Sequence, residues 1–156
     1  MENKMFCYQC QETAGCTGCT QSGVCGKKPD VAAMQDLLVY VTKGISAVAV
    51  QLRAEGKEVA PAVNHLVTLN LFTTITNANF DDESILARVR KGLELRDRLK
   101  ACAVEAGIVL PEADELTWNG KEEEYLSKSA SVGVLREPNE DLRSLKELLM
   151  YGLKGM

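Results

Sequence analysis

The sequence lacks an excess of positive charge and has no long uninterrupted apolar run. Its 18 Lys and Arg side chains are outnumbered by 22 Asp and Glu side chains, whereas a nucleic-acid-binding surface gathers basic residues on one face. The longest apolar stretch, Leu37 to Leu52, contains Lys43 and Gln51 and is too short and too interrupted to cross a bilayer. These absences predict a protein with no nucleic-acid partner and no membrane partner.

A secretory signal and the common catalytic motifs are also missing from the sequence. The first four residues lead into cysteines instead of an apolar h-region, so we expect a cytoplasmic protein. No GxGxxG, Walker-type loop, GxSxG or HExxH pattern occurs, and no second histidine accompanies His65. We therefore predict no catalytic residue, no nucleotide site and no hydrolytic site in this chain.

Cysteine, by contrast, is abundant near the N-terminus. Five of the six cysteines lie within the first 25 residues: Cys7, Cys10, Cys16, Cys19 and Cys25. In a reducing compartment a disulfide framework explains such a cluster poorly, and five is an odd number for pairing, so thiolates that hold a metal ion or cluster are the better explanation. The sixth, Cys102, falls on the apolar side of a predicted helix and is expected to be buried as a small hydrophobic residue.

The cysteine spacing suits two kinds of metal site. Cys7-x2-Cys10 and Cys16-x2-Cys19 are CxxC pairs, which direct two sulfurs at one centre in both zinc and iron–sulfur sites. The segment 6–28 lacks the strand alternation of a zinc knuckle and is rich in small residues, so it can wrap around a bulky group and direct backbone N–H groups at its sulfurs. Neither common ferredoxin spacing is present. The pattern favours iron–sulfur over zinc, without indicating which four thiolates bind.

Beyond the cysteines, the sequence predicts an all-α fold. Apolar residues recur at three- and four-residue steps over about 29–56, 61–77 and 81–107, and the short connections favour an antiparallel bundle. After an acidic connection, two more helices are predicted over 122–131 and 139–154.

Three parts of the chain follow from this pattern. Residues 1–28 form a cysteine-rich loop, 29–107 a three-helix bundle, and 108–156 the acidic connection with two helices of an incomplete second bundle. The last helix carries an apolar stripe without a third helix to cover it, formed by Leu142, Leu145, Leu148, Leu149 and Leu153. Because a two-helix unit buries little surface on its own, we expect this chain to belong to something larger or to pair with a second copy through this helix.

The N-terminal segment also resembles a known family. The strings FCYQCQET (residues 6–13), TGCT (17–20) and GVCGK (23–27) closely resemble the N-terminus of the hybrid cluster proteins, also called prismane proteins or hydroxylamine reductases. The resemblance implies the N-terminal all-α domain of that family. It further implies that the family pattern C-x2-C-x8-C-x5-C, here Cys7, Cys10, Cys19 and Cys25, holds a 4Fe-4S cluster. Cys16 lies outside this pattern.

The resemblance implies a redox function for the chain. In the family the first cluster passes electrons to a hybrid iron–sulfur–oxygen cluster, which reduces hydroxylamine to ammonia and water; reduction of nitric oxide has also been proposed. The ligands of that hybrid cluster belong to later domains, so the 156-residue chain is not expected to be catalytically competent alone. Its implied partners are the remaining domains of the full-length enzyme and a redox electron donor. The alternative is a cysteine-rich structural zinc-binding or interaction module without a redox role.

Overall fold

The computed structural model describes residues 5–75, 79–118 and 120–156. In these residues the regular structure is helical and contains no strand, only one isolated β-bridge. The predicted all-α fold is therefore confirmed. The helices, in chain order, are α1 (Pro29–Ala54), α2 (Pro61–Ile75), α3 (Asp82–Glu105), α4 (Asp114–Thr117), α5 (Tyr125–Val132) and α6 (Glu140–Gly155), with the 3-10 turns η1 (Ala14–Cys16), η2 (Glu122–Glu124) and η3 (Val134–Arg136).

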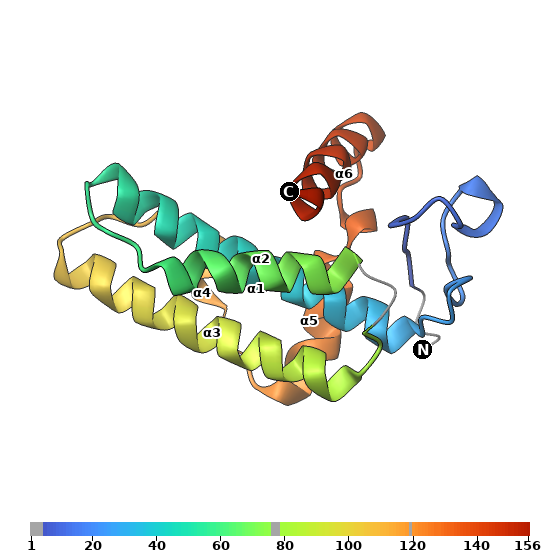
Figure 1. The fold of residues 1–156 in the computed structure, drawn as a ribbon, viewed down its shortest axis with the longest axis horizontal. Helices are drawn as coiled ribbons and strands as arrows, with labels where there is room; N and C mark the ends of the chain where they lie inside the picture. Colours follow the sequence, from blue (N-terminus) through green and yellow to red (C-terminus); the bar gives the residue numbers. More distant parts are fainter. Residues whose placement is uncertain (1–4, 76–78, 119) are drawn as a thin grey trace.

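Helix α1 is the centre of the fold, with α2 and α3 packed along it and α5 against its other side (Figure 1). Proline stands at the first position of α1, where its missing N–H is not needed, and Asp30 Oδ1 accepts a hydrogen bond from Val31 N at 2.9 Å. The core around α1 is closed to solvent. Its fully buried apolar side chains are Leu37, Leu38, Val41, Ile45 and Val48 from α1, with Ile85 and Val89 from α3.

Helix α1 extends beyond the apolar stretch 37–52 at both ends, as the helical periodicity over about 29–56 predicted. It runs for 26 residues and is, within the described chain, the one helix long and apolar enough to cross a membrane by length and composition. In this structure 56% of its most apolar window is buried. Because the core helix of a globular protein meets the same criterion, this length carries no membrane assignment.

A buried arginine ties the segment after α3 onto α1. Arg96 is fully buried, and its Nη1 donates to the carbonyl oxygens of Glu115 at 3.0 Å and Trp118 at 2.6 Å. The Glu115 carbonyl lies so close to Gly44 of α1 that a Cβ there would stand 2.4 Å from it. This part of the acidic connection is therefore fixed against the bundle by buried polar contacts, which hydrophobic periodicity does not reveal.

Helix α6 lies outside the three-helix bundle and contacts it through α2 (Figure 1). It starts at Asn139, whose Oδ1 accepts from Leu142 N at 2.9 Å, the bond of an N-cap. The leucine stripe is exposed, from 44% at Leu142 to 71% at Leu148. The uncovered stripe predicted from the sequence is confirmed, whereas Lys154 on the same helix is buried.

Other expectations differ from the structure in detail. Cys102 is exposed, not buried. At this turn of α3, the side chain that packs into the core is that of its neighbour Ala103. Helix α4 was not predicted, since four residues are too few to show periodicity. The predicted end of the second helix, at residue 77, lies outside the described residues.

Candidate metal centre

The cysteine loop, residues 5–28, leads directly into the first turn of α1 (Figure 1). Cys7 and Cys19 pair across it as an antiparallel bridge, with Cys7 N donating to Cys19 O at 3.1 Å and Cys19 N donating to Cys7 O at 2.9 Å. Met5, Cys19 and Ala32 of α1 form a small buried cluster, against which Cys7 packs. The first and third predicted ligands are thus brought together beside the first turn of α1.

Glycine allows two close approaches within the cysteine loop. At Gly18, φ is +119° and a Cβ would lie 2.5 Å from the Phe6 ring. At Gly23, a Cβ would lie 3.0 Å from Cys25 Sγ. Side chains larger than hydrogen at these two positions would move Phe6 or the Cys25 sulfur, so the small residues noted in the sequence have a steric reason.

The Cys19 sulfur accepts a hydrogen bond from the backbone of its own loop. Ala14 N donates to Cys19 Sγ at 3.4 Å, and Thr13 Oγ1 lies 3.7 Å from it. Backbone N–H groups, first that of Ala14 and then that of Val24, lower the pKa of the Cys19 thiol, since they stabilise the thiolate that binds metals. This sulfur is prepared for ligation by the loop itself.

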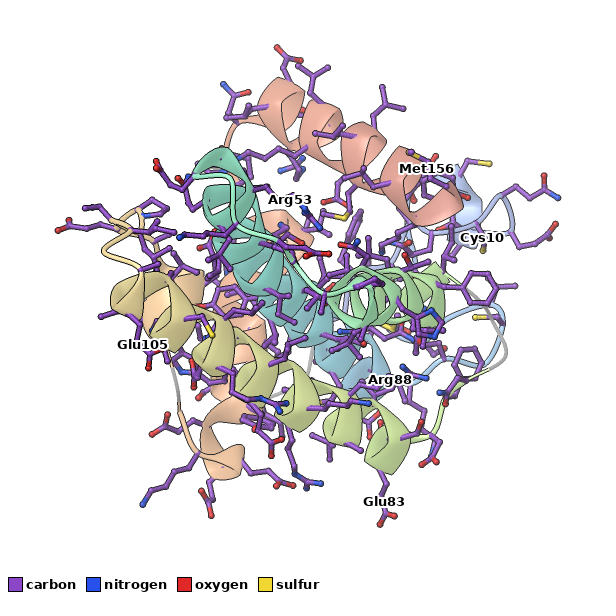
Figure 2. The ribbon with its side chains drawn as sticks, turned by 60° about the vertical axis from the view of Figure 1, so that its left-hand side comes forward. Cys10, Arg53, Glu83, Arg88, Glu105 and Met156 are labelled. Carbon is purple, nitrogen blue, oxygen red and sulfur yellow. The ribbon has the colours of Figure 1, made fainter. Side chains whose placement is uncertain are left out.

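The remaining loop cysteines differ in exposure. Cys10 is half-buried, and Cys16 and Cys25 are exposed. Cys16 has a φ of +58°, in the left-handed region, and its carbonyl accepts from Tyr8 Oη at 3.1 Å. Figure 2 shows Cys10 on the same side of the molecule as the C-terminal end of α6, and Lys154 of that helix lines the same cavity as Cys10.

An open cavity of about 750 Å³ is lined by the cysteine loop, α1 and α6. Cys7, Cys10 and Cys16 line its loop side. On the helix side, Lys154 Nζ donates to Gln9 Oε1 at 3.0 Å and joins α6 to the loop. Burial lowers the pKa of Lys154 to about 8 and raises the pKa of Asp36, on α1, to about 7. The cavity therefore has charged groups on its walls and cysteines along one edge.

Five of the cysteines lie in one loop, but their side chains do not converge on a single metal position. Within the described residues, no three His, Cys, Asp or Glu side chains form a group that could hold a metal ion. These side chains would therefore have to move to bind either a single zinc ion, which needs its sulfurs about 2.3 Å away, or a cluster. All six cysteines are free thiols. The donor set, with its glycine-rich loop and its N–H groups on Cys19, fits the chemistry of a thiolate-bound iron–sulfur group.

Two side chains facing this site were not singled out from the sequence. Lys27 is buried with its Nζ 3.7 Å from Cys7 Sγ, and Gln35 of α1 is buried on the wall of the same cavity. Lysine two residues after Cys25 was visible in the sequence as part of the CGK string. Gln35 gave no signal, because a glutamine among apolar residues shows its role only when its neighbours are known.

Together these features define an all-α domain that carries a cysteine-only donor set on an N-terminal loop. The chain belongs to the Prismane/CO dehydrogenase family, whose model matches residues 5–156. It is 50% identical over its whole length to a hydroxylamine reductase of Desulfovibrio desulfuricans. It is 57% identical over 97% of its length to one of Desulfitobacterium hafniense, and 52% identical over 97% to one of Bacteroides fragilis. The chain spans 27–28% of the length of these relatives.

Proposed function

We propose that this chain is the N-terminal electron-transfer domain of a hydroxylamine reductase, with a 4Fe-4S cluster held by Cys7, Cys10, Cys19 and Cys25. The observation that carries the proposal is the Cys19 sulfur, which accepts an N–H bond from Ala14 within a loop of free thiols. The membership of the family and its relatives' names support the same assignment.

The cluster would supply one-electron transfer towards the hybrid cluster of the later domains. The loop itself positions the sulfurs and stabilises negative charge on them. The Cys7–Cys19 bridge holds two sulfurs at the first turn of α1, and the N–H groups on Cys19 stabilise negative charge on its sulfur. The partners in this proposal are the remaining domains of the enzyme, an electron donor and, through α6, a second copy where those domains are absent.

Anaerobic reconstitution with iron and sulfide tests this function. We expect a brown protein with about four irons per chain, whose broad visible absorbance is bleached by dithionite. A colourless protein that retains stoichiometric zinc instead would support the structural zinc module. Hydroxylamine should not be reduced by this chain on its own, and an active preparation free of contaminating enzyme would contradict that expectation.

Serine substitutions test the choice of ligands. Cys19→Ser removes a sulfur with its own N–H donor, so we expect it to lose most of the iron. Cys16→Ser is the matched control, since Cys16 is exposed and lies outside the family spacing, and we expect it to keep the full iron content. Equal iron loss from both variants would show that the assigned set of four is wrong.

A further inference from the structure

A buried lysine faces the sulfur side of the cysteine loop. Lys27 is only 1% exposed, and its Nζ donates to Cys7 Sγ at 3.7 Å. The Phe80 ring centroid lies 5.9 Å from the same nitrogen. In the described part of the chain, no carboxylate forms an ion pair with Lys27. Burying an ammonium group is costly unless it meets negative charge, so this lysine lies where negative charge on sulfur would offset that cost.

The turn before α1 fixes this lysine between two of the assigned ligands. Gly23 N donates to Lys27 O at 2.8 Å. A Cβ on Gly23 would lie 3.0 Å from Cys25 Sγ and 3.0 Å from Lys27 Cβ. The Lys27 Cβ and the Cys25 sulfur therefore both border Gly23, while the Lys27 amino group reaches the Cys7 sulfur.

A second buried group points to the same site independently. Gln35 is 5% exposed, and its Nε2 has no hydrogen-bond partner among the residues that the structure describes. It lies one turn after Ala32, whose side chain packs with Cys19. Gln35 and Lys27 line the same cavity as Cys7 and Cys10. An unpaired buried amide is costly. A half-turn of this amide about its last side-chain torsion would direct Nε2 into the cavity, where the sulfurs of Cys7 and Cys10, or a group that they hold, would give it an acceptor.

We propose that Lys27 and Gln35 raise the reduction potential of the cluster by stabilising its reduced form. This inference rests on the proposed function, because it needs a cluster at the cysteine loop. Reduction adds one electron from an external low-potential donor and breaks no bond, so the cluster becomes more negative by one charge. A buried positive charge and an N–H donor favour that more negative state, and nearby charge and hydrogen bonds to sulfur are known determinants of cluster potential.

An EPR-monitored redox titration of the reconstituted chain tests Lys27. In Lys27→Met, we expect the ratio of reduced to oxidised cluster at a fixed potential to fall about tenfold, a shift of about 59 mV for one electron. Lys28→Met is the matched control, because it removes the same formal charge from the exposed neighbouring residue. Its ratio should change less than about threefold, or about 28 mV. A fully loaded Lys27→Met protein that shifts no more than this control overturns the proposal.

Gln35→Met tests the amide with little change in side-chain volume. The ratio should fall about threefold, or about 28 mV, because one N–H donor is removed without loss of charge. An unchanged midpoint in a loaded Gln35→Met protein overturns the part of the proposal that concerns Gln35.

If Lys27→Met takes up no cluster, thermal unfolding of the metal-free chain tests the proposal instead. A thermal unfolding midpoint at or above that of the wild type supports the proposal, because the lysine then serves the cluster and not the fold. A lower midpoint overturns it, since the residue would be needed for folding itself. A wild-type chain that binds no cluster under the same conditions would instead overturn the proposed function, and the two failures are distinguishable.

Discussion

The bundle around α1 and the cysteine loop are held together by different forces. The bundle closes over side chains with no exposed surface, such as Leu38 and Ile45. The loop buries one small cluster around Met5 and Cys19 and otherwise depends on turns, N–H groups and glycines. Apolar burial stabilises folded protein by about 25 cal/mol per Å², so the bundle has its own source of stability. The loop has few such contacts, and its order depends much more on what its thiols bind.

The largest expected effect is in the bundle. Leu38→Ala removes a fully buried side chain from the centre of α1, and we expect a loss of about 3 kcal/mol in the free energy of unfolding. Val50→Ala on the same helix is the control, because Val50 is 57% exposed and should change stability by less than about 0.5 kcal/mol. Guanidinium unfolding followed by circular dichroism measures both. Equal losses would mean that α1 is not the core helix.

Binding of the cluster should slow amide hydrogen exchange in the loop more than in the bundle. After reconstitution with iron and sulfide, we expect the amides of Cys7 and Cys19 to exchange at least about tenfold more slowly, or about 1.4 kcal/mol. The α1 amide of Ile45 should change much less, because its helix is already packed. Hydrogen exchange on loaded protein and on protein treated with iron alone gives the comparison. Uniform protection of loop and bundle would contradict the difference between the two regions.

Asp36 lies where the bundle meets the cavity and adds a pH dependence. Its pKa is about 7 in the folded chain, raised by burial from an ordinary value of 3.8, with the nearby Lys154 partly opposing the rise and Glu147 adding to it. Between pH 4 and 7 the folded protein keeps a proton that the unfolded chain has lost. Stability should therefore fall as pH rises through this range and level off above 7.

Asp36→Asn isolates this carboxyl from the other titrating groups. We expect the variant to lose the stability decrease between pH 4 and 7 in guanidinium unfolding series. Asp141→Asn, which removes an exposed carboxyl from α6, should retain it. A wild-type stability that rises across this range, with no difference between the variants, would contradict the burial of Asp36.

The smallest effect on stability is expected in α6. Leu145 and Leu149 are 64% and 67% exposed, so changing both to Gln should alter the free energy of unfolding by less than about 0.5 kcal/mol. Sedimentation at high concentration should show less self-association than the wild type, because the apolar stripe is interrupted. A loss of more than about 2 kcal/mol would show that the stripe is packed within this chain.

The sequence predicted best those helices that are long and bury one face. Apolar residues at helical steps indicated α1 and α3 with small errors at their ends, because such a pattern reports directly which face is buried. Cys102 was misassigned, since one residue of rotation about α3 moves a side chain from the core to solvent. The short α4 has no period to recognise, and it is fixed by Arg96 and by the close approach to Gly44.

The candidate site, too, could be predicted from the sequence only in part. Sequence was sufficient to find the five loop cysteines and to predict an uncovered stripe on α6, because spacing and composition are local properties. It did not identify Lys27 or Gln35 as neighbours of the sulfurs. Their role depends on burial and on the Cys7–Cys19 bridge beside α1, and both arise only when distant segments pack.

By itself, then, the sequence determined the chemistry that this chain offers: thiols at one end, helices with one apolar face, and no excess of basic charge. The tertiary structure decided which charged and polar groups lose water next to those thiols. The physical reason is that ligand type and helical period are encoded in neighbouring residues, whereas the free energy of a buried charge depends on everything packed around it.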